Sequence, residues 1–459
     1  MKYEIIKPLS CDWNVFGNIL QEVKYEHFKI KNRVIQLYYD YTNMQSIYKA
    51  QNGVYPKDRD IYGSPYATYV YRTIVPEFPV SITTNITSVI QKATKLWSSS
   101  RTDILRGNKS IPSFRRNGPI ELNGESIRKV KYPEDENSNY KNKRYVQLDL
   151  ALVSKGGVNV LKEKFKNAVK DGKNKKSKKY TDEQLEKITT SYTILIDGGK
   201  KSAKAIIDRV ISGDYSVKGS SIVYNSEKRK WMLTLVYQME KADNEELNPD
   251  RVMGIDMGVV NAVYMAVNDD DWWRDRIEGG EIQQKRFQLE SQKQKLQRAS
   301  KIVGKSKIGH GYYKRTQRVN RKSKKISNMR ETINHKYSRY IVDKALALGC
   351  GTIQMEDLSG ISEYDRFLKN WTYYDLQQKI TYKAAEHGIK VIKTDPHFTS
   401  QRCSKCGYID EANRDKTQGQ GKFECVKCGY KTHADHNAAR NISIPYIDQI
   451  IKEERSMYI

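Results

Sequence analysis

The sequence has no hydrophobic run that approaches the ~18 residues needed by a membrane-spanning helix. Its N-terminal segment, Met1–Ser10, also lacks the long apolar core of a signal peptide. We therefore expect a cytoplasmic protein with no membrane partner.

Cysteine is scarce, with six residues in a chain of 459. In a reducing compartment cysteines are thiols or metal ligands rather than disulfides. Cys11 and Cys350 have no partner spacing, so each is interpreted as a small buried side chain. The other four form two CxxC pairs: Cys403, Cys406, Cys425 and Cys428.

Acidic residues are outnumbered by basic ones, 54 against 81, which gives a formal net charge of +27. Such an excess attracts polyanions, although solvated lysines alone would be the plainer interpretation. The 32 tyrosines interleaved with these bases suit base stacking, and together they favour nucleic-acid binding.

The densest basic segment runs from Lys285 to Lys325, with fifteen Lys and Arg and one acid, Glu290. A solvated helical hairpin would normally intersperse Glu, so we favour contact with a nucleic-acid backbone. The Lys-rich run from Lys170 to Lys179 is interpreted instead as a solvated loop. The candidate nucleic-acid-binding residues are Lys314, Arg315, Arg318, Arg321 and Lys322.

The chain is long enough for two or three domains. After a first strand at residues 2–7, apolar spacing predicts a mostly helical region over residues 13–105. Short β-rich runs then predict a barrel or curled sheet with one inserted helix at 203–211. Its strands are expected at residues 145–150, 192–196, 220–224 and 231–236. A third region begins at Met253, with strands expected at 253–256, 262–267 and 351–356.

The two CxxC pairs predict one structural zinc ion, because four thiolates in two close pairs can close a tetrahedral site. Each pair is followed by Gly-Tyr, and glycine permits the tight turn around the metal. His433 and His436 lie close by, but a complete Cys₄ set leaves them no place as ligands. We favour His436 as the histidine that faces an active cleft.

Three acids form a second candidate metal site. Asp256 and Glu356 end apolar strands, where an isolated charge is costly, and Asp435 lies on the expected first turn of a helix. Taken one at a time, Asp256 could be a turn residue, Glu356 a residue at the end of a strand, and Asp435 a helix N-cap. Together they could hold two Mg²⁺ ions about 4 Å apart, an arrangement that hydrolyses phosphodiesters.

Four motifs carry a resemblance to a known family. They are Gly-Ile-Asp256-x-Gly, Gln-Met-Glu356-Asp-Leu, Thr-Ser-Gln-Arg402-Cys-Ser-x-Cys and Ala-Asp435-x-Asn-Ala-Ala-Arg-Asn. They resemble the split RuvC motifs of the TnpB and type V CRISPR nuclease superfamily. The opening Tyr-Glu-Ile-Ile-Lys-Pro-Leu and the segments 335–343 and 370–379 resemble the miniature type V-F effectors, which are prokaryotic. The likeness is weakest over residues 156–185, a Lys-rich insertion.

The resemblance implies a multidomain α+β fold. Residues 1–12 would be the first strand of a wedge β-barrel, 13–112 a helical recognition domain, and 113–248 the wedge β-barrel. Residues 249–400 would form an RNase H-like RuvC α/β nuclease domain with the first two motifs. A zinc-ribbon target-nucleic-acid-binding element would follow at 401–430, then the third motif and a C-terminal helix at 431–459. Because Cys11 stands alone, the additional N-terminal zinc module of some relatives should be missing.

The resemblance also implies the chemistry and the partners. Asp256, Glu356 and Asp435 would be the Mg²⁺-binding catalytic acids, and Arg402 would meet the scissile strand. The partners would be a guide RNA and double-stranded target DNA carrying a short T-rich flanking motif, with a homodimer on one guide RNA. Base pairing reads the sequence in such enzymes, so the protein needs mainly a grip on the backbone.

Three alternatives remain open on sequence alone. One is a transposon-encoded TnpB-like nuclease with the same chemistry, and another is an unguided RNase H-like nuclease. The third is a non-catalytic RNA-binding protein in which the carboxylates are structural.

Overall fold

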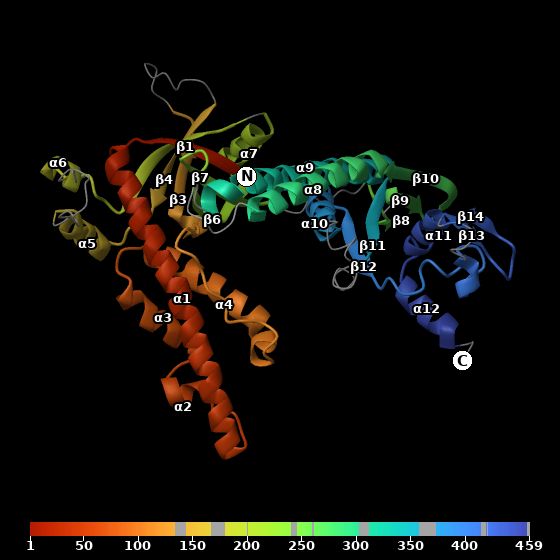
Figure 1. Cartoon of the computed structure of the whole chain (residues 1–459), viewed down its shortest axis with the longest axis horizontal. Helices are drawn as coiled ribbons and strands as arrows, with labels where there is room; N and C mark the ends of the chain where they lie inside the picture. Colours follow the sequence, from red (N-terminus) through yellow and green to blue (C-terminus); the bar gives the residue numbers. More distant parts are fainter. Residues whose placement is uncertain are drawn as a thin grey trace. The chain divides into compact units, whose positions relative to one another are not determined.

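The computed structural model describes residues 1–133, 144–166, 180–199, 201–239, 246–258, 261–302, 312–357, 373–414, 419 and 421–456. The chain divides into two compact units, an N-terminal unit (Met1–Glu240) and a C-terminal unit (Lys241–Ile459) (Figure 1). None of the described helices is long and apolar enough to cross a membrane.

The helical region predicted near the N-terminus is confirmed. It consists of α1 (Trp13–Asn52), α2 (Asp58–Tyr62), α3 (Tyr66–Glu77) and α4 (Thr83–Leu105). The Asp12 side chain caps α1 by accepting the Val15 N–H at 2.9 Å, and Gly53 ends it in the left-handed conformation. The short helix α2 is only five residues long and ends at Gly63, which is in the left-handed conformation.

The N-terminal unit also contains a seven-stranded sheet in the order β2-β6-β7-β1-β5-β4-β3. Its edge strands, β2 (Ile120–Leu122) and β3 (Ile127–Lys131), are separated by only four residues of chain. The two edges must therefore lie close together, and the sheet curls until it is nearly closed. The remaining strands are β1 (Lys2–Pro8), β4 (Tyr145–Ala151), β5 (Ser191–Asp197), β6 (Tyr215–Asn225) and β7 (Lys230–Met239).

Three helices accompany this sheet: α5 (Lys155–Lys166), α6 (Asp182–Glu186) and α7 (Lys201–Ser212). The inserted helix predicted at 203–211 is α7. Helices α5 and α6 were not predicted, and in the sequence they lie on either side of the run from Lys170 to Lys179. The run from Lys170 to Lys179 lies outside the described residues.

The C-terminal unit is built on a five-stranded sheet in the order β10-β9-β8-β11-β12. The neighbouring strands β8, β11 and β12 are parallel, whereas β9 and β10 are antiparallel additions. All three strands predicted in this region are confirmed. The strands are β8 (Asn248–Asp256), β9 (Asn261–Val267), β10 (Asp270–Glu278), β11 (Cys350–Glu356) and β12 (Lys390–Thr394).

Side chains alternate between the two faces of this sheet. On one face Met253, Ile255 and Met355 pack with residues of α9 (Tyr312–Ala347) and α10 (Tyr373–Ala385). On the other face Tyr264 and Ala266 pack against α11 (Ala434–Ile442). Two further helices are α8 (Gly280–Ile302), which packs against α9, and α12 (Ile447–Ser456). The mixed helix and sheet composition is thus established, and the domain names given above remain predictions.

Candidate metal-dependent active site and cysteine cluster

The three predicted acids come from three elements that meet on the α11 face of the C-terminal sheet. Asp256 ends β8 and Glu356 ends β11, and these neighbouring parallel strands pair in register up to Ile255 and Met355. Asp435 lies in the first turn of α11, which packs on β8 and β9.

Gly254 allows α11 to approach the sheet closely. A Cβ at this position would lie 2.2 Å from the Ala439 carbonyl oxygen and 2.4 Å from the Ser443 nitrogen. Any side chain here would therefore push the helix away from the strand. The glycine of the Gly-Ile-Asp motif is needed for this contact, which sets the N-terminal end of α11 beside the carboxylates.

The site accumulates negative charge. Burial raises the pKa of Asp256 well above its ordinary value, and the charges of Glu356 and Asp435 raise it further. Burial also raises the pKa of Glu356, partly offset by a hydrogen bond from Thr399. Neighbouring carboxyl groups of this kind stay protonated to a higher pH unless a cation binds among them.

Neutral donors orient two of the carboxylates. The Asn261 side-chain amide donates to Asp435 Oδ2 at 2.7 Å. The Thr399 hydroxyl donates to Glu356 Oε1 at 2.5 Å. Sequence reasoning missed both residues. Asn261 could have been identified, because it is a polar residue at the start of an otherwise apolar strand. Thr399 is the first residue of the Thr-Ser-Gln-Arg402 motif, of which only the arginine was considered.

One arginine, Arg414, acts electrostatically on two of the acids. It closes the short 3₁₀ helix η4 (Glu411–Arg414), and its charge lowers the pKa of both Asp256 and Glu356 against the effect of burial. Its buried Nε has no hydrogen-bond partner among the described residues. No spacing rule singles it out from the other bases of the segment, so the sequence did not reveal it.

The structure gives Arg402 a different setting from the one the resemblance implied. Its Nε and Nη2 form a two-pronged ion pair with Glu454 of α12 at 2.8 and 2.7 Å. Its Nη1 donates to Asn441 Oδ1 at 2.9 Å, and the residue is only 7% exposed. These contacts tie the ribbon to α11 and α12. The predicted contact with the scissile strand would require Arg402 to leave them, and it stays a prediction.

The expectation that His436 is the histidine facing the cleft is wrong. His436 is buried, and burial lowers its pKa to about 4. The His433 side chain instead caps α11 by accepting the Asp435 N–H at 3.2 Å. Its Nδ1 lies 3.9 Å from Asp435 Oδ2, so His433 rather than His436 borders the acids.

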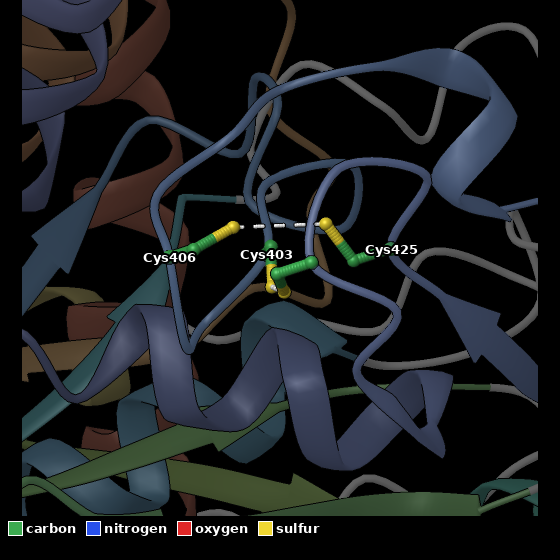
Figure 2. A group of neighbouring side chains, drawn as sticks. Cys403, Cys406 and Cys425 are labelled. Atoms are coloured by element: carbon green, nitrogen blue, oxygen red, sulfur yellow. Dashed lines mark hydrogen bonds between the residues drawn. The ribbon is translucent and has the colours of Figure 1, made fainter.

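The four cysteines form a cluster whose ligand atoms all lie within 4.8 Å of one another. The Sγ atoms of Cys406 and Cys425 are 3.6 Å apart, and the dashed line in Figure 2 joins them. Those of Cys403 and Cys428 are 3.8 Å apart. A tetrahedron of sulfurs about 2.3 Å from a zinc ion has edges of roughly 3.8 Å. The cluster therefore has the size of a zinc site.

Two matching backbone turns hold these sulfurs. Gly407 and Gly429 donate to the carbonyls of Cys403 and Cys425, both at 2.9 Å. Both glycines have positive φ, 77° and 68°, as predicted for the tight turn. Burial raises the pKa of Cys403 to about 12, so a thiolate at this position needs a cation. Among the described residues, the carboxylate oxygens of the three acids do not form a group as close as that of the four cysteine sulfurs.

The remaining two cysteines lie apart from the cluster. Cys350 is buried at the start of β11, and Cys11 is partly buried. Burial raises the pKa of each to about 11, which disfavours a reactive thiolate.

The predicted basic segment forms α8 and the first half of α9. Its one acid, Glu290, accepts from Arg330 at 2.9 Å and so links the two helices. Lys314, Arg318 and Arg321 are exposed, while Lys322 donates to Gln292 at 2.6 Å. The side chain of Arg315 lies outside the described residues. These residues remain candidates for contact with nucleic acid.

Known proteins resemble both the sequence and the fold. The profile of the Cas12f1-like TNB domain matches residues 373–442, and that of a probable transposase, OrfB of IS605, matches residues 234–362. A putative RNA-guided DNA endonuclease, InsQ of Escherichia coli, is 26% identical over 46% of this chain and 53% of its own. A Cas12f1–sgRNA–target DNA complex shares the fold, with a TM-score of 0.65 and 22% identity over 94% of this chain and 83% of that one.

Two relatives match over most of their length. The CRISPR-associated endodeoxyribonuclease Cas12f1 of Sulfoacidibacillus thermotolerans is 42% identical over 98% of either chain. The protein of the same name from Syntrophomonas palmitatica is 33% identical over 86% of this chain and 78% of its own. With this identity and coverage, the chain belongs to the Cas12f1 family.

Proposed function

We propose that this protein is a CRISPR RNA-guided DNA endonuclease that cleaves target DNA at one site formed by Asp256, Glu356 and Asp435. The general part of this proposal, a CRISPR-associated nuclease, is supported by family membership. The observation that carries the specific part is the gathering of three carboxylates, with raised pKa values for Asp256 and Glu356, on one face of the sheet.

The three acids are the residues that would hold Mg²⁺. Mg²⁺ prefers carboxylate oxygens and keeps several waters, so a site built from three acids and the substrate phosphate fits it. Two such ions activate a water and stabilise the leaving oxygen in phosphodiester hydrolysis. The raised pKa values fit the same interpretation, because a carboxylate cluster that repels itself favours a bound cation.

Residues of the chain itself position this site. Asn261 and Thr399 fix the orientation of Asp435 and Glu356 without adding charge. Arg414 is placed to meet the negative charge that develops on the transferred phosphate. We assign it the role that the resemblance implied for Arg402.

The cysteine cluster is proposed to hold one structural Zn²⁺ and thereby the segment that carries Arg414. Asn413 donates to the Gln401 carbonyl at 2.8 Å and accepts the Val426 N–H at 2.9 Å. It thus links both cysteine turns to η4, so metal at the cluster would fix the position of the neighbouring arginine.

Guide RNA and double-stranded DNA are the proposed partners, with a T-rich flanking motif read on the duplex and two protein copies on one guide RNA. The net charge of +27 suits the grip on two nucleic-acid backbones. The solved Cas12f1 complex contains an sgRNA and target DNA.

The direct test is programmed cleavage. The protein is purified with an RNA whose guide segment matches one plasmid, and cutting is followed in Mg²⁺ and in chelator. We expect cutting of the matched plasmid alone, and only with Mg²⁺ or Mn²⁺. Cutting that ignores the guide would favour an unguided nuclease, and cutting in chelator would refute the metal mechanism.

A TnpB-like enzyme is the second candidate, favoured by the transposase profile and by the likeness to InsQ. Sequencing the RNA that copurifies from the native locus separates the two. Repeat–spacer transcripts would support the CRISPR assignment, whereas transposon-end RNA would overturn it.

A further inference from the structure

Trp272 stands in solvent near the start of β10, the strand that pairs with β9. It is 88% exposed, the highest value among the large hydrophobic side chains that the structure describes. The turn that carries it is well defined, because Asp270 Oδ1 accepts the N–H groups of Trp272 and Trp273 at 2.9 and 3.0 Å. Trp273 packs against the core of the unit, whereas its neighbour faces outward.

Arg440 of α11 holds this turn in place. Its guanidinium donates to the carbonyls of Val267 and Asp270 and to the carboxylate of Asp271. The turn between β9 and β10 is therefore fastened to the same helix that carries Asp435. An aromatic ring on a fastened turn loses little conformational freedom when a ligand stacks on it.

Two arginines continue from Trp272 along β10. Arg274 pairs with Ala266 and Arg276 with Tyr264, so their side chains emerge on the face of the sheet that α11 covers. Both are exposed, and Arg276 also contacts Glu278 at 2.7 Å. They lie two residues apart, about 6.7 Å along the strand, so each can meet a separate phosphate.

Tyr264 connects these arginines to the acids. Its ring stacks on that of His433 at 5.6 Å and 13°, and His433 borders Asp435. Burial raises the pKa of Tyr264, while Arg274 and Arg276 act in the opposite direction and Asp435 adds to the rise. The tyrosine therefore lies within electrostatic reach of both the arginines and the catalytic acid.

We propose that the β9–β10 hairpin is a track for a single DNA strand that leads into the active site. Trp272 stacks on an unpaired base, and Arg274 and Arg276 contact successive phosphates on the way to Asp435. The strand must be single, because bases within a duplex already stack on each other and offer no free face to the indole. This inference rests on the proposed function, since it identifies the form of DNA that the site receives.

The side chains exposed here favour this occupant over a protein segment, although β10 carries four acids beside its two arginines. β10 is an edge strand, so a peptide could in principle add to it. Such a peptide would use the backbone of β10, and it would require neither the indole ring nor the two guanidinium groups. Phosphates and bases require both.

Binding is tested on the full chain with its guide RNA, in an Asp256→Asn background that prevents cutting. The probe is a six-nucleotide thymidine-rich DNA strand that carries one 5-iododeoxyuridine. Affinity is read by fluorescence anisotropy, and the site of contact by light-induced crosslinking and peptide mapping. Trp272→Ala should weaken binding roughly tenfold, whereas Trp272→Phe keeps a ring and should stay within about twofold.

The matched control is Tyr446→Ala, which removes another aromatic side chain, 74% exposed, from the same unit. It should leave both affinity and adduct unchanged. Arg274→Gln should weaken binding and reduce the slope of log affinity against log salt by about 0.7. Equal binding by Trp272→Ala and Tyr446→Ala, or adducts only outside residues 270–278, would overturn the track.

The outcome for the track is separable from that for the proposed function. If the wild type performs guided cutting while binding ignores Trp272, the track alone is refuted. If the Trp272 adduct forms but no guided cutting occurs, the track stands as a strand-binding surface and the nuclease assignment fails.

Discussion

A buried acid of the N-terminal unit is neutralised by neighbouring lysines, whereas the acid cluster of the C-terminal unit is not neutralised in this way. In the N-terminal unit the Glu121 side chain is 5% exposed and receives Lys31 at 2.6 Å and Lys92 at 2.8 Å. In the C-terminal unit the charges of Glu356 and Asp435 raise the pKa of Asp256, and the Arg414 charge lowers the pKa of both Asp256 and Glu356 only against the larger effect of burial.

The same contrast holds for a second buried acid of the N-terminal unit. Both oxygens of Glu26 accept backbone N–H groups, from Val80 at 2.9 Å and Ser81 at 2.6 Å. Paired carboxylates of this kind connect α1 to α4, to β2 and to the chain that precedes α4. Unpaired carboxylates contribute nothing to such architecture and disfavour the folded state. Buried acids therefore indicate a functional site where their neighbours leave the charge uncompensated.

The largest expected effect comes from Asp256→Asn. Guided cleavage should fall roughly a thousandfold or more, because a carboxylate that holds the ions is lost. Guide RNA binding should persist, and the free energy of unfolding should be unchanged or raised, since one like charge is removed. Cleavage rates, RNA affinity and urea unfolding measured on one preparation check this. Cutting at the wild-type rate would remove Asp256 from the site.

The opposite result is expected for Glu121→Gln. The buried Lys31 would lose its counter-charge, so the free energy of unfolding of the N-terminal unit should fall by about 3–5 kcal/mol. Urea unfolding followed by fluorescence measures the loss. Glu183→Gln, in an exposed pair with Lys187, is the matched control and should have little effect. Equal stability of the two variants would show that the buried pairing is not structural.

The strand acids could be predicted from the sequence because their signal is local. An apolar strand that ends in a carboxylate is visible in the residues around Asp256 and Glu356, and two CxxC pairs with glycine are equally visible. The curled sheet followed from short β-rich runs in the same way. The short strands β2 and β3 were missed because three and five residues carry too little pattern.

The directions of single side chains could not be predicted, since packing decides them. Arg402 is held by Glu454, which lies 52 residues further along the chain, and the arginine whose charge acts on Asp256 is instead Arg414. The choice between His433 and His436 depends on where α11 begins, and neither spacing nor composition fixes that residue. Asn261 acquires its role only when the strand and helix meet.

Cys425→Ser removes one ligand from the cysteine cluster, the second group of the C-terminal unit that we expect to bind a metal. The zinc content should fall from about one ion per chain to none. The cleavage rate should fall more than about tenfold, because η4 and Arg414 would no longer be held in place by the cluster. Guide RNA should stay bound. Cys350→Ser changes a buried cysteine outside the cluster and should retain the metal. Metal analysis decides, and a full zinc content in Cys425→Ser would refute the ribbon.

The smallest effect concerns His27, a neutral group in the N-terminal unit. Burial lowers its pKa to about 3, and its Nδ1 accepts the Glu121 N–H at 3.1 Å. The unfolded chain takes up this proton near pH 6.5 and the folded chain only near pH 3, so stability is lost as pH falls through this window. Between pH 7 and 5 the loss should be about 2 kcal/mol.

His27→Asn keeps a hydrogen-bond acceptor but cannot titrate, so it is the control for this effect. Urea unfolding at pH 7 and pH 5 should show a smaller pH dependence for the variant than for the wild type. The same pH dependence in both proteins would mean that His27 is protonated in the folded state.

The central claim is that divalent ions bind between Asp256, Glu356 and Asp435, and iron-directed backbone cleavage tests it directly. Fe²⁺ replaces Mg²⁺ in the guide-loaded protein, and peroxide then generates hydroxyl radicals that cut the chain beside the bound ion. We predict fragments that end near residues 256, 356 and 435, suppressed by excess Mg²⁺ and absent in Asp256→Asn. Cuts elsewhere, or the same cuts in that variant, would contradict the account.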